Sequence, residues 1–335
     1  MKLASLRRGG RDGTLIVVDH RLQQAVTVAE IAPTLQRALE CWREAAPRLA
    51  AVSASLAAGQ CANAFTFNEH EMASPLPRSY QFLDGSVYLY HMEKARRARG
   101  VEMPPNYQTE PLMYQGMSDG FGGPRDAMHL ASEDLEIDYE AEIAVMTDDV
   151  PMGVSAVDAR KHILLVMLMN DWTARALTRS ELPKGFGFLQ SKPTSAFSPL
   201  ALTPDELGAA WDGGRLSLPL LSAVNGKRIG APNAGLDMFF TYPELIAHAA
   251  RTRTLGAGTI IGGGAVSNRD PASGHGCLAE VRVHEQEVHG AARTPWLRFG
   301  DVVRIEMLDT QGRSLFGAIE QRLERSSLEK SGDSS

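Results

Sequence analysis

The chain has 335 residues, of which 44% are hydrophobic and 22% charged, a composition typical of a globular protein with a full hydrophobic core. A net charge of −6 gives no support to binding of nucleic acid or of an anionic membrane surface. The three cysteines, Cys41, Cys61 and Cys277, form no Cys-x-x-Cys pair, so neither a zinc knuckle nor a disulfide framework is predicted. We expect a cytoplasmic protein, because the N-terminus lacks a long apolar run and the run over 163–169 is too short to span a bilayer.

The first seventy or so residues predict a small β-rich domain that also contains helix. Short apolar runs over 3–6, 14–18 and 25–28, separated by turn residues, indicate strands. Apolar residues at helical spacing predict a helix over 33–46 that Pro47 interrupts, and a second short helix over 49–58. The composition changes after this region, which predicts an accessory domain over 1–72, a larger domain over 73–325 and a disordered tail over 326–335.

The larger domain contains more predicted strands than helices. Helices are predicted in part of 156–169 and over 243–250, and strand-like segments over 141–146, 216–224, 259–261, 278–283, 302–307 and 315–319. Strands and helices do not alternate regularly, which argues against a doubly wound parallel sheet. The pattern therefore predicts an α+β, mostly β fold.

Three carboxylates stand out within the predicted strands of this domain. Glu140 and Glu142 lie one residue apart, so their side chains share one face of a strand, where two like charges are unfavourable unless a cation neutralises them. Asp171 closely follows the apolar run over 163–169, where a carboxylate needs a partner. Such oxygen ligands suit Mg²⁺, Ca²⁺ or Mn²⁺ better than zinc. The spacing alone also fits two glutamates on the solvated face of an edge strand.

Two further features have more than one interpretation. His91 follows Asp84 by seven residues, but a single histidine in an apolar segment is more often a hydrogen-bonded core residue than a catalyst, and Asp84 with the next glycine also fits a turn. The glycine-rich segment over 256–265 lacks the Gly-Lys-Ser/Thr of a phosphate-binding loop. It predicts a tight turn whose backbone N–H groups are free to hold a carboxylate.

Short motifs occur in a fixed order over residues 75–323: Asp84 with His91, Tyr-Gln-Gly at 114–116, Asp-Tyr-Glu-Ala-Glu at 138–142, Asn-Asp-Trp-Thr-Ala-Arg at 170–175, Gly-Phe-Gly-Phe-Leu-Gln-Ser-Lys-Pro at 185–193 and Phe-Gly-Asp-Val-Val-Arg-Ile-Glu at 299–306. This order resembles the fumarylacetoacetate hydrolase (fumarylacetoacetase) family, in a bacterial two-domain form. The resemblance implies a fumarylacetoacetase C-terminal-like fold, a mixed β-sandwich or roll, with a small N-terminal β-rich domain. It also implies a homodimer.

The resemblance further implies a site for one divalent cation, Mg²⁺ or Ca²⁺ with Mn²⁺ as an alternative. Its ligands would be Asp84, Glu140, Glu142 and Asp171. The implied general base is His91, oriented by Glu280, although Glu280 also fits the exposed face of a strand. The residues implied to contact substrate oxygens are Lys192, Tyr114 and Arg99, and Lys192 would also stabilise or protonate the departing carbanion.

The activity implied is metal-dependent hydrolysis of the carbon–carbon bond of a β-diketone acid, fumarylacetoacetate or a related acylpyruvate, in aromatic or tyrosine catabolism. Ser86, Thr178 and Ala265 stand where the fumarylacetoacetate-cleaving enzymes have tyrosine, glutamine and threonine, which leaves the specific acid open. The alternatives are a 2-oxo acid decarboxylase, an isomerase or a sugar-acid dehydratase or hydrolase on the same metal site, and a catalytically silent metal-binding homologue.

Overall fold

The computed structural model describes residues 1–98 and 100–326. Arg99, predicted to contact substrate, and residues 327–335 of the predicted tail lie outside the described residues. Among the described residues, no helix combines the length and apolar character needed to cross a membrane.

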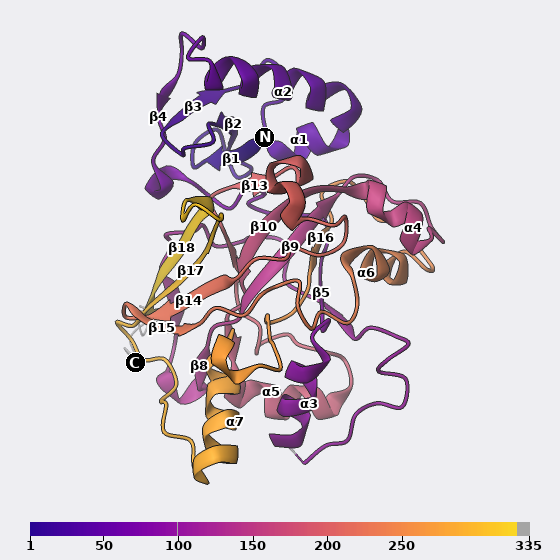
Figure 1. The fold of residues 1–335 in the computed structure, drawn as a ribbon, viewed down its shortest axis with the longest axis vertical. Helices are drawn as coiled ribbons and strands as arrows, with labels where there is room; N and C mark the ends of the chain where they lie inside the picture. Colours follow the sequence, from indigo (N-terminus) through magenta and orange to yellow (C-terminus); the bar gives the residue numbers. More distant parts are fainter. Residues whose placement is uncertain (99, 327–335) are drawn as a thin grey trace, which may run out of the picture.

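A large mixed sheet runs through the molecule from the N-terminal segment to the lower half of the view in Figure 1. Its strand order is β4-β3-β2-β1-β13-β10-β9-β16-β5-β6, with β12 paired to β10. The strands are β1 Lys2–Leu6, β2 Thr14–Val18, β3 Gln24–Thr27, β4 Phe65–Thr66, β5 Phe82–Gly85, β6 Met113–Gln115, β9 Ala141–Thr147, β10 Ile163–Asn170, β12 Ala196–Phe197, β13 Ala201–Leu202 and β16 Ile260–Gly262. The N-terminal strands extend this sheet because β1 pairs with β13.

A second sheet packs beside the first, in the order β15-β14-β17-β18-β7, and a short ribbon pairs β11 with β8. These strands are β7 Met128–Leu130, β8 Ile137–Asp138, β11 Thr173–Ala174, β14 Leu220–Val224, β15 Lys227–Gly230, β17 Val302–Leu308 and β18 Ser314–Arg325. The helices are α1 Leu35–Glu40, α2 Trp42–Ala57, α3 Leu89–Ala98, α4 Ala156–Ala159, α5 Arg175–Glu181, α6 Tyr242–Ala249 and α7 Leu278–His289. The predicted α+β, mostly β fold is confirmed.

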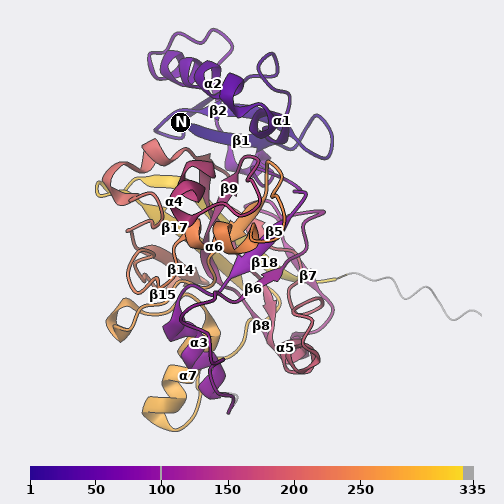
Figure 2. The same cartoon turned by 90° about the vertical axis from the view of Figure 1, so that its right-hand side faces the viewer.

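The central strands are mostly apolar because both faces of the sheet are covered, although β9 also contains Glu142. Every residue of β9 and β10 is buried. Successive residues of β10 enter two separate cores, with Val166 and Leu168 on one face and Met167 and Met169 on the other. Helices α1 and α2 contribute to the second core, while α3, α5 and α7 gather at the opposite end of the molecule, as Figures 1 and 2 show.

Two of the predicted elements differ from those observed. The helix break lies at Cys41, and α2 continues through Pro47, which is exposed, so water can bond the carbonyl that its missing N–H would have paired. The segment 278–283 was expected to be a strand and is the first half of α7. The helix predicted in part of 156–169 is confirmed: α4 and a short 3₁₀ turn occupy the start of the segment, and the rest is β10.

Candidate metal and catalytic site

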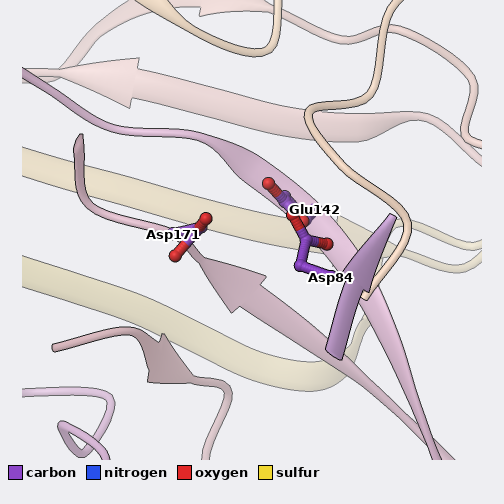
Figure 3. A group of neighbouring side chains, drawn as sticks. All are labelled: Asp84, Glu142 and Asp171. Atoms are coloured by element: carbon purple, nitrogen blue, oxygen red, sulfur yellow. The ribbon is translucent and has the colours of Figure 1, made fainter. Parts of the chain in front are cut away.

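Three of the predicted carboxylates converge at the ends of neighbouring strands. Asp84 lies in β5, Glu142 lies in β9 and Asp171 follows β10, and one oxygen from each lies within 4.8 Å of the others. Figure 3 shows the three side chains directed into one space between these elements. All three residues are buried. We call Asp84, Glu142 and Asp171 the acidic triad.

Glycines of the predicted glycine-rich segment leave room for the carboxylates of the acidic triad to approach one another. Gly262 lies in β16 between β9 and β5, and a Cβ atom there would lie 2.4 Å from Asp84 Oδ1. The Gly264 N–H donates to Asp84 Oδ1 at 3.1 Å and to Glu142 Oε2 at 3.0 Å. The backbone N–H expected to be free for a carboxylate is therefore directed at two carboxylates of the chain itself.

The charges of two triad members are only partly balanced by the chain. Burial and the neighbouring Asp171 carboxylate raise the pKa of Asp84 to about 8. Burial, reinforced by the nearby Asp84 carboxylate, also raises the pKa of Glu142 well above its usual range. Glu142 Oε1 is buried with no hydrogen-bond partner among the described residues. An unpartnered buried carboxylate oxygen beside like charges is the pattern expected where a cation ligand belongs.

Glu140 was also predicted to be a metal ligand, but in the structure it is bound by cations of the chain. Lys192 Nζ donates to Glu140 Oε2 at 2.5 Å, and Arg175 Nη2 donates to Glu140 Oε1 at 2.7 Å. Burial alone would raise the pKa of Glu140, but the charges of Lys192 and Arg175 hold that pKa well below its usual range. Glu140 lies beside the acidic triad without sharing the 4.8 Å cluster.

Lys192 links the triad to Glu140. Its Nζ also donates to Asp171 Oδ2 at 2.5 Å and to Thr173 Oγ1 at 2.9 Å. The Tyr114 hydroxyl donates to the same Asp171 oxygen at 2.8 Å. Lys192 and Tyr114, two of the three residues predicted to contact substrate, therefore both hydrogen-bond a member of the triad.

His91 and Glu280 are 189 positions apart in the sequence and form a direct pair. His91 Nδ1 lies 2.6 Å from Glu280 Oε1, on the facing helices α3 and α7. Burial would lower the pKa of His91, but the hydrogen bond to Glu280 and the charges of Glu280 and Glu140 together outweigh burial and raise that pKa. Glu280 is 2% exposed, which rules out its placement on a solvated strand face.

The structure adds three residues whose roles the sequence did not indicate. Asp138 accepts from the Arg175 guanidinium at 2.7 Å and from the Leu278 N–H at 2.8 Å, so it anchors the start of α7. His275 places Nδ1 at 3.3 Å from the second oxygen of Glu280. Arg175 and Asp138 are present in the quoted motifs, which was the available signal, whereas the sequence around His275 gave none.

One cavity of about 560 Å³ has Asp84, Glu140, His91 and Lys192 in its wall. Ser86, Thr178 and Ala265, the residues that differ from the fumarylacetoacetate-cleaving pattern, line the same cavity. The site therefore combines an acidic cluster suited to a hard divalent cation, a histidine held by a carboxylate and a buried lysine.

Two family models match the chain. Residues 82–324 match the fumarylacetoacetate (FAA) hydrolase C-terminal model, and residues 1–78 match the fumarylacetoacetase N-terminal domain 2 model. Similar proteins include a 2,4-didehydro-3-deoxy-L-rhamnonate hydrolase of Sphingomonas sp. (strain SKA58), 26% identical over 61% of this chain and 64% of that protein. The oxaloacetate tautomerase YisK of Bacillus subtilis (strain 168) is also 26% identical, with the same coverage of 61% and 64%. The chain thus spans slightly less than two thirds of the length of these curated relatives.

Solved structures share the fold along nearly the whole chain. Maleylpyruvate hydrolase from Sphingobium sp. SYK-6 has a TM-score of 0.64 at 15% identity, covering 97% of this chain and 100% of that one. A further structure of that enzyme, in complex with manganese(II) and pyruvate, has a TM-score of 0.64 at 17% identity and the same coverage. The fumarylacetoacetate hydrolase of Exiguobacterium antarcticum has a TM-score of 0.64 at 16% identity, again covering 97% and 100%. The chain belongs to the fumarylacetoacetate hydrolase family.

Proposed function

We propose that this chain is a divalent-metal-dependent hydrolase that cleaves the carbon–carbon bond of a β-diketone acid, fumarylacetoacetate or a related acylpyruvate. The observation that carries the proposal is the 2.6 Å contact of His91 Nδ1 with Glu280 Oε1, because His91 lines the same cavity as Asp84 of the acidic triad. A carboxylate on Nδ1 fixes the imidazole tautomer and leaves Nε2 free to accept a proton from water.

The cation would be held by Asp84, Glu142 and Asp171, with Glu140 beside them. Mg²⁺ or Ca²⁺ fits this all-oxygen donor set, and Mn²⁺ is the alternative that the manganese complex of maleylpyruvate hydrolase supports. When bound, such a cation supplies Lewis acidity toward the chelated oxygens of a dicarbonyl acid.

The chain's own groups account for the proton movements of hydrolysis. His91 Nε2 takes a proton from water, the resulting hydroxide adds to the carbonyl carbon, and the bond to the neighbouring carbon breaks. The electron pair of that bond remains on the departing keto-acid carbanion, which becomes acetoacetate from fumarylacetoacetate or pyruvate from an acylpyruvate once it takes a proton. Lys192 would stabilise this carbanion or protonate it, and Tyr114 would donate a hydrogen bond to a substrate oxygen. These roles are consistent with the burial of Lys192 and with its position beside Asp171.

A second candidate is keto–enol tautomerisation or isomerisation of a 2-oxo acid. The similarity of the chain to the oxaloacetate tautomerase from Bacillus subtilis supports this candidate. That reaction also uses a cation and a base, but it leaves the carbon skeleton intact. The two functions therefore differ in their products rather than in the residues they need.

The test is a panel of acylpyruvates, fumarylacetoacetate and oxaloacetate, followed by loss of enol absorbance and by chromatography of the products. Hydrolysis yields two acids from each diketo acid, requires Mg²⁺ or Mn²⁺ after chelation, and falls by about 100-fold or more in His91→Ala. Loss of enol absorbance without cleavage products would assign the tautomerase function instead. Full turnover in excess chelator, or no turnover of any acid by the metal-loaded protein, would contradict both functions.

We also propose a homodimer, on the basis of the family resemblance. Light scattering of the purified chain at micromolar concentration tests it, and a monomeric mass would contradict it.

A further inference from the structure

The Glu280 carboxylate holds two histidines, one on each oxygen. His91 Nδ1 contacts Oε1 at 2.6 Å, and His275 Nδ1 contacts Oε2 at 3.3 Å. Glu280 and His275 are only 2% and 7% exposed, so water does not compete freely for either group. The proposed reaction requires only the first of these contacts, and the second is therefore unexplained by it.

The backbone of His275 is held in place by contacts with the second sheet. The Ser222 hydroxyl, on β14, donates to the His275 carbonyl at 3.4 Å. A Cβ atom at Gly230, on β15, would lie 2.4 Å from the His275 nitrogen, so the two backbones touch. The second sheet thus packs against His275, which lies just before the start of α7.

The imidazole of His275 is enclosed on its other side by α7. The His284 ring lies 5.4 Å from it, centroid to centroid, with an interplanar angle of 48°. The His275 ring therefore contacts two residues of α7, Glu280 and His284, which lie one helical turn apart. A ring with two such contacts is suited to fixing a partner, whereas a loosely held ring would follow the movements of that partner.

The protonation of the three groups follows from hydrogen-bond capacity. Burial would raise the pKa of Glu280, but hydrogen bonds from His275 and His91 lower it to about 2. An ionised carboxylate only accepts hydrogen bonds, so both histidines must present Nδ1–H to it. In the neutral form of His91 this tautomer leaves Nε2 unprotonated, 4.0 Å from Glu140 Oε1, and His91 is part of the cavity wall.

We propose that His275 is a positioning residue for the base: by donating Nδ1–H to Glu280 Oε2, it holds the carboxylate in the orientation that directs Oε1 at His91. The inference rests on the proposed function of His91. Without His275, Oε2 would be a buried unpaired acceptor, and rotation of the carboxylate would trade the His91 contact for other partners.

The first experiment needs no variant. Nitrogen-15 NMR of the wild-type protein, labelled on histidine and loaded with Mg²⁺, reports the tautomer of each ring. The proposal predicts that, in mildly alkaline solution and without substrate, the neutral rings of both His91 and His275 are Nδ1–H tautomers. An Nε2–H tautomer at His275 would leave Nδ1 without a proton to donate and would overturn the proposal.

The second experiment compares His275→Phe with His275→Gln, using kcat, KM and the His91 signal. His275→Phe should lower kcat by about 10- to 100-fold, as loss of an orienting partner does, with KM changed by less than about threefold, and should shift the His91 signal. His275→Gln should restore kcat to within about fivefold of wild type, because its amide can donate to Glu280.

The same two substitutions at His162 are the matched control. His162 Nδ1 pairs with Asp148 Oδ1 at 2.6 Å and does not line the cavity, so these variants should retain kcat. Wild-type kcat and an unchanged His91 signal in a folded His275→Phe protein would overturn the proposal. If no acid is turned over, the proposed function fails, while the NMR experiments still test the arrangement of the three residues.

Discussion

Two pairs of buried carboxylates in or near one cavity differ in how the chain balances their charge. Asp84 and Glu142 share the Gly264 N–H as a donor, and their pKa values are raised. Glu140 and Glu280 are equally buried, yet Lys192 and Arg175 bind the first, two histidines bind the second, and their pKa values are lowered. Burial is shared by the four groups, so the difference comes from the partners.

The comparison indicates which charges are left for a ligand. A carboxylate whose cation is built into the chain stays ionised without help, and it can orient or stabilise a neighbour. A carboxylate without such a partner either holds a proton at neutral pH or binds an external cation. We therefore assign the cation to the side of Asp84 and Glu142, and the proton chemistry to the side of Glu280.

Replacing Lys192 should have the largest effect on stability, because it removes a cation that balances the buried carboxylates. Lys192→Met leaves Glu140 and Asp171, each 2.5 Å from Lys192 Nζ, without that cation in a buried site. We expect the free energy of unfolding of the metal-free protein to fall by about 3–5 kcal/mol. Urea unfolding in excess chelator measures this change.

The control is Lys161→Met, which breaks an exposed pair with Asp158 and should change stability by less than about 1 kcal/mol. Equal stability of the two variants would mean that the buried carboxylates do not depend on Lys192 for their charge.

Substituting the triad should remove the cation and spare the fold. Glu142→Gln keeps the shape of the side chain but loses its charge, and we expect affinity for Mn²⁺ or Mg²⁺ to fall by more than about 100-fold, since a ligand matters at least as much as an outer-shell partner. Calorimetric titration measures the affinity. The metal-free variant should be at least as stable as wild type, because the pKa of Glu142 is raised by burial and by Asp84.

Glu306→Gln is the control, because Glu306 pairs with Arg304 and lies outside the cavity wall. Undiminished cation affinity in Glu142→Gln would place the cation elsewhere, and a strong loss of metal-free stability would show that the charge of Glu142 is already balanced.

The fold could be predicted where the spacing of apolar residues alone determines the local structure. The strand over 14–18 is observed over the same residues as β2, and the mostly β character follows from many short apolar runs between turns. The segment 278–283 was mistaken for a strand because Val281 and Val283 alternate with Glu280 and Arg282, as in a half-buried strand. What makes it a helix is tertiary: Asp138, from a distant part of the chain, accepts the N–H groups of Leu278 and Ala279 at its start.

The site was predicted less completely than the fold, for a related reason. The shared surroundings of Asp84, Glu142 and Asp171 follow from strands that pair in register, and family motifs marked all three. Glu140 differs because its charge is balanced by two side chains that no local pattern places beside it. His275 could not be found at all, since its role depends on a carboxylate held on a helix that the sequence did not indicate.

Glu280→Gln should show, through the pH dependence of stability, what a carboxylate with partners in the chain contributes. The pKa of Glu280 is lowered in the folded state to about 2, below its unfolded value, so its contribution is present above about pH 4.5 and is lost as pH falls toward 2. A lowering of this size corresponds to about 2–3 kcal/mol at neutral pH. Urea unfolding at pH 7, 5, 4 and 3 should show wild type and variant converging in acid.

Glu142→Gln, studied without metal, is the matched control with the opposite sign. Because the folded pKa of Glu142 is raised, wild type should lose stability relative to this variant as pH rises above about 4.5. Parallel pH profiles for the two variants would contradict the distinction between paired and unpaired carboxylates.

Changes in the cavity wall away from both carboxylate pairs should have the smallest effect and alter only the choice of substrate. Ser86→Tyr and Thr178→Gln introduce the side chains of the fumarylacetoacetate-cleaving pattern into the lining of the cavity. Each added donor should change the ratio of kcat/KM for fumarylacetoacetate over a smaller acylpyruvate by about tenfold, the effect of one modest pocket contact. Affinity for Mn²⁺ should stay within about twofold of wild type, because neither residue contacts the acidic triad. A changed cation affinity with an unchanged ratio would mean that these positions support the metal side rather than the substrate side, and the separation of the cavity into two functions would then be wrong.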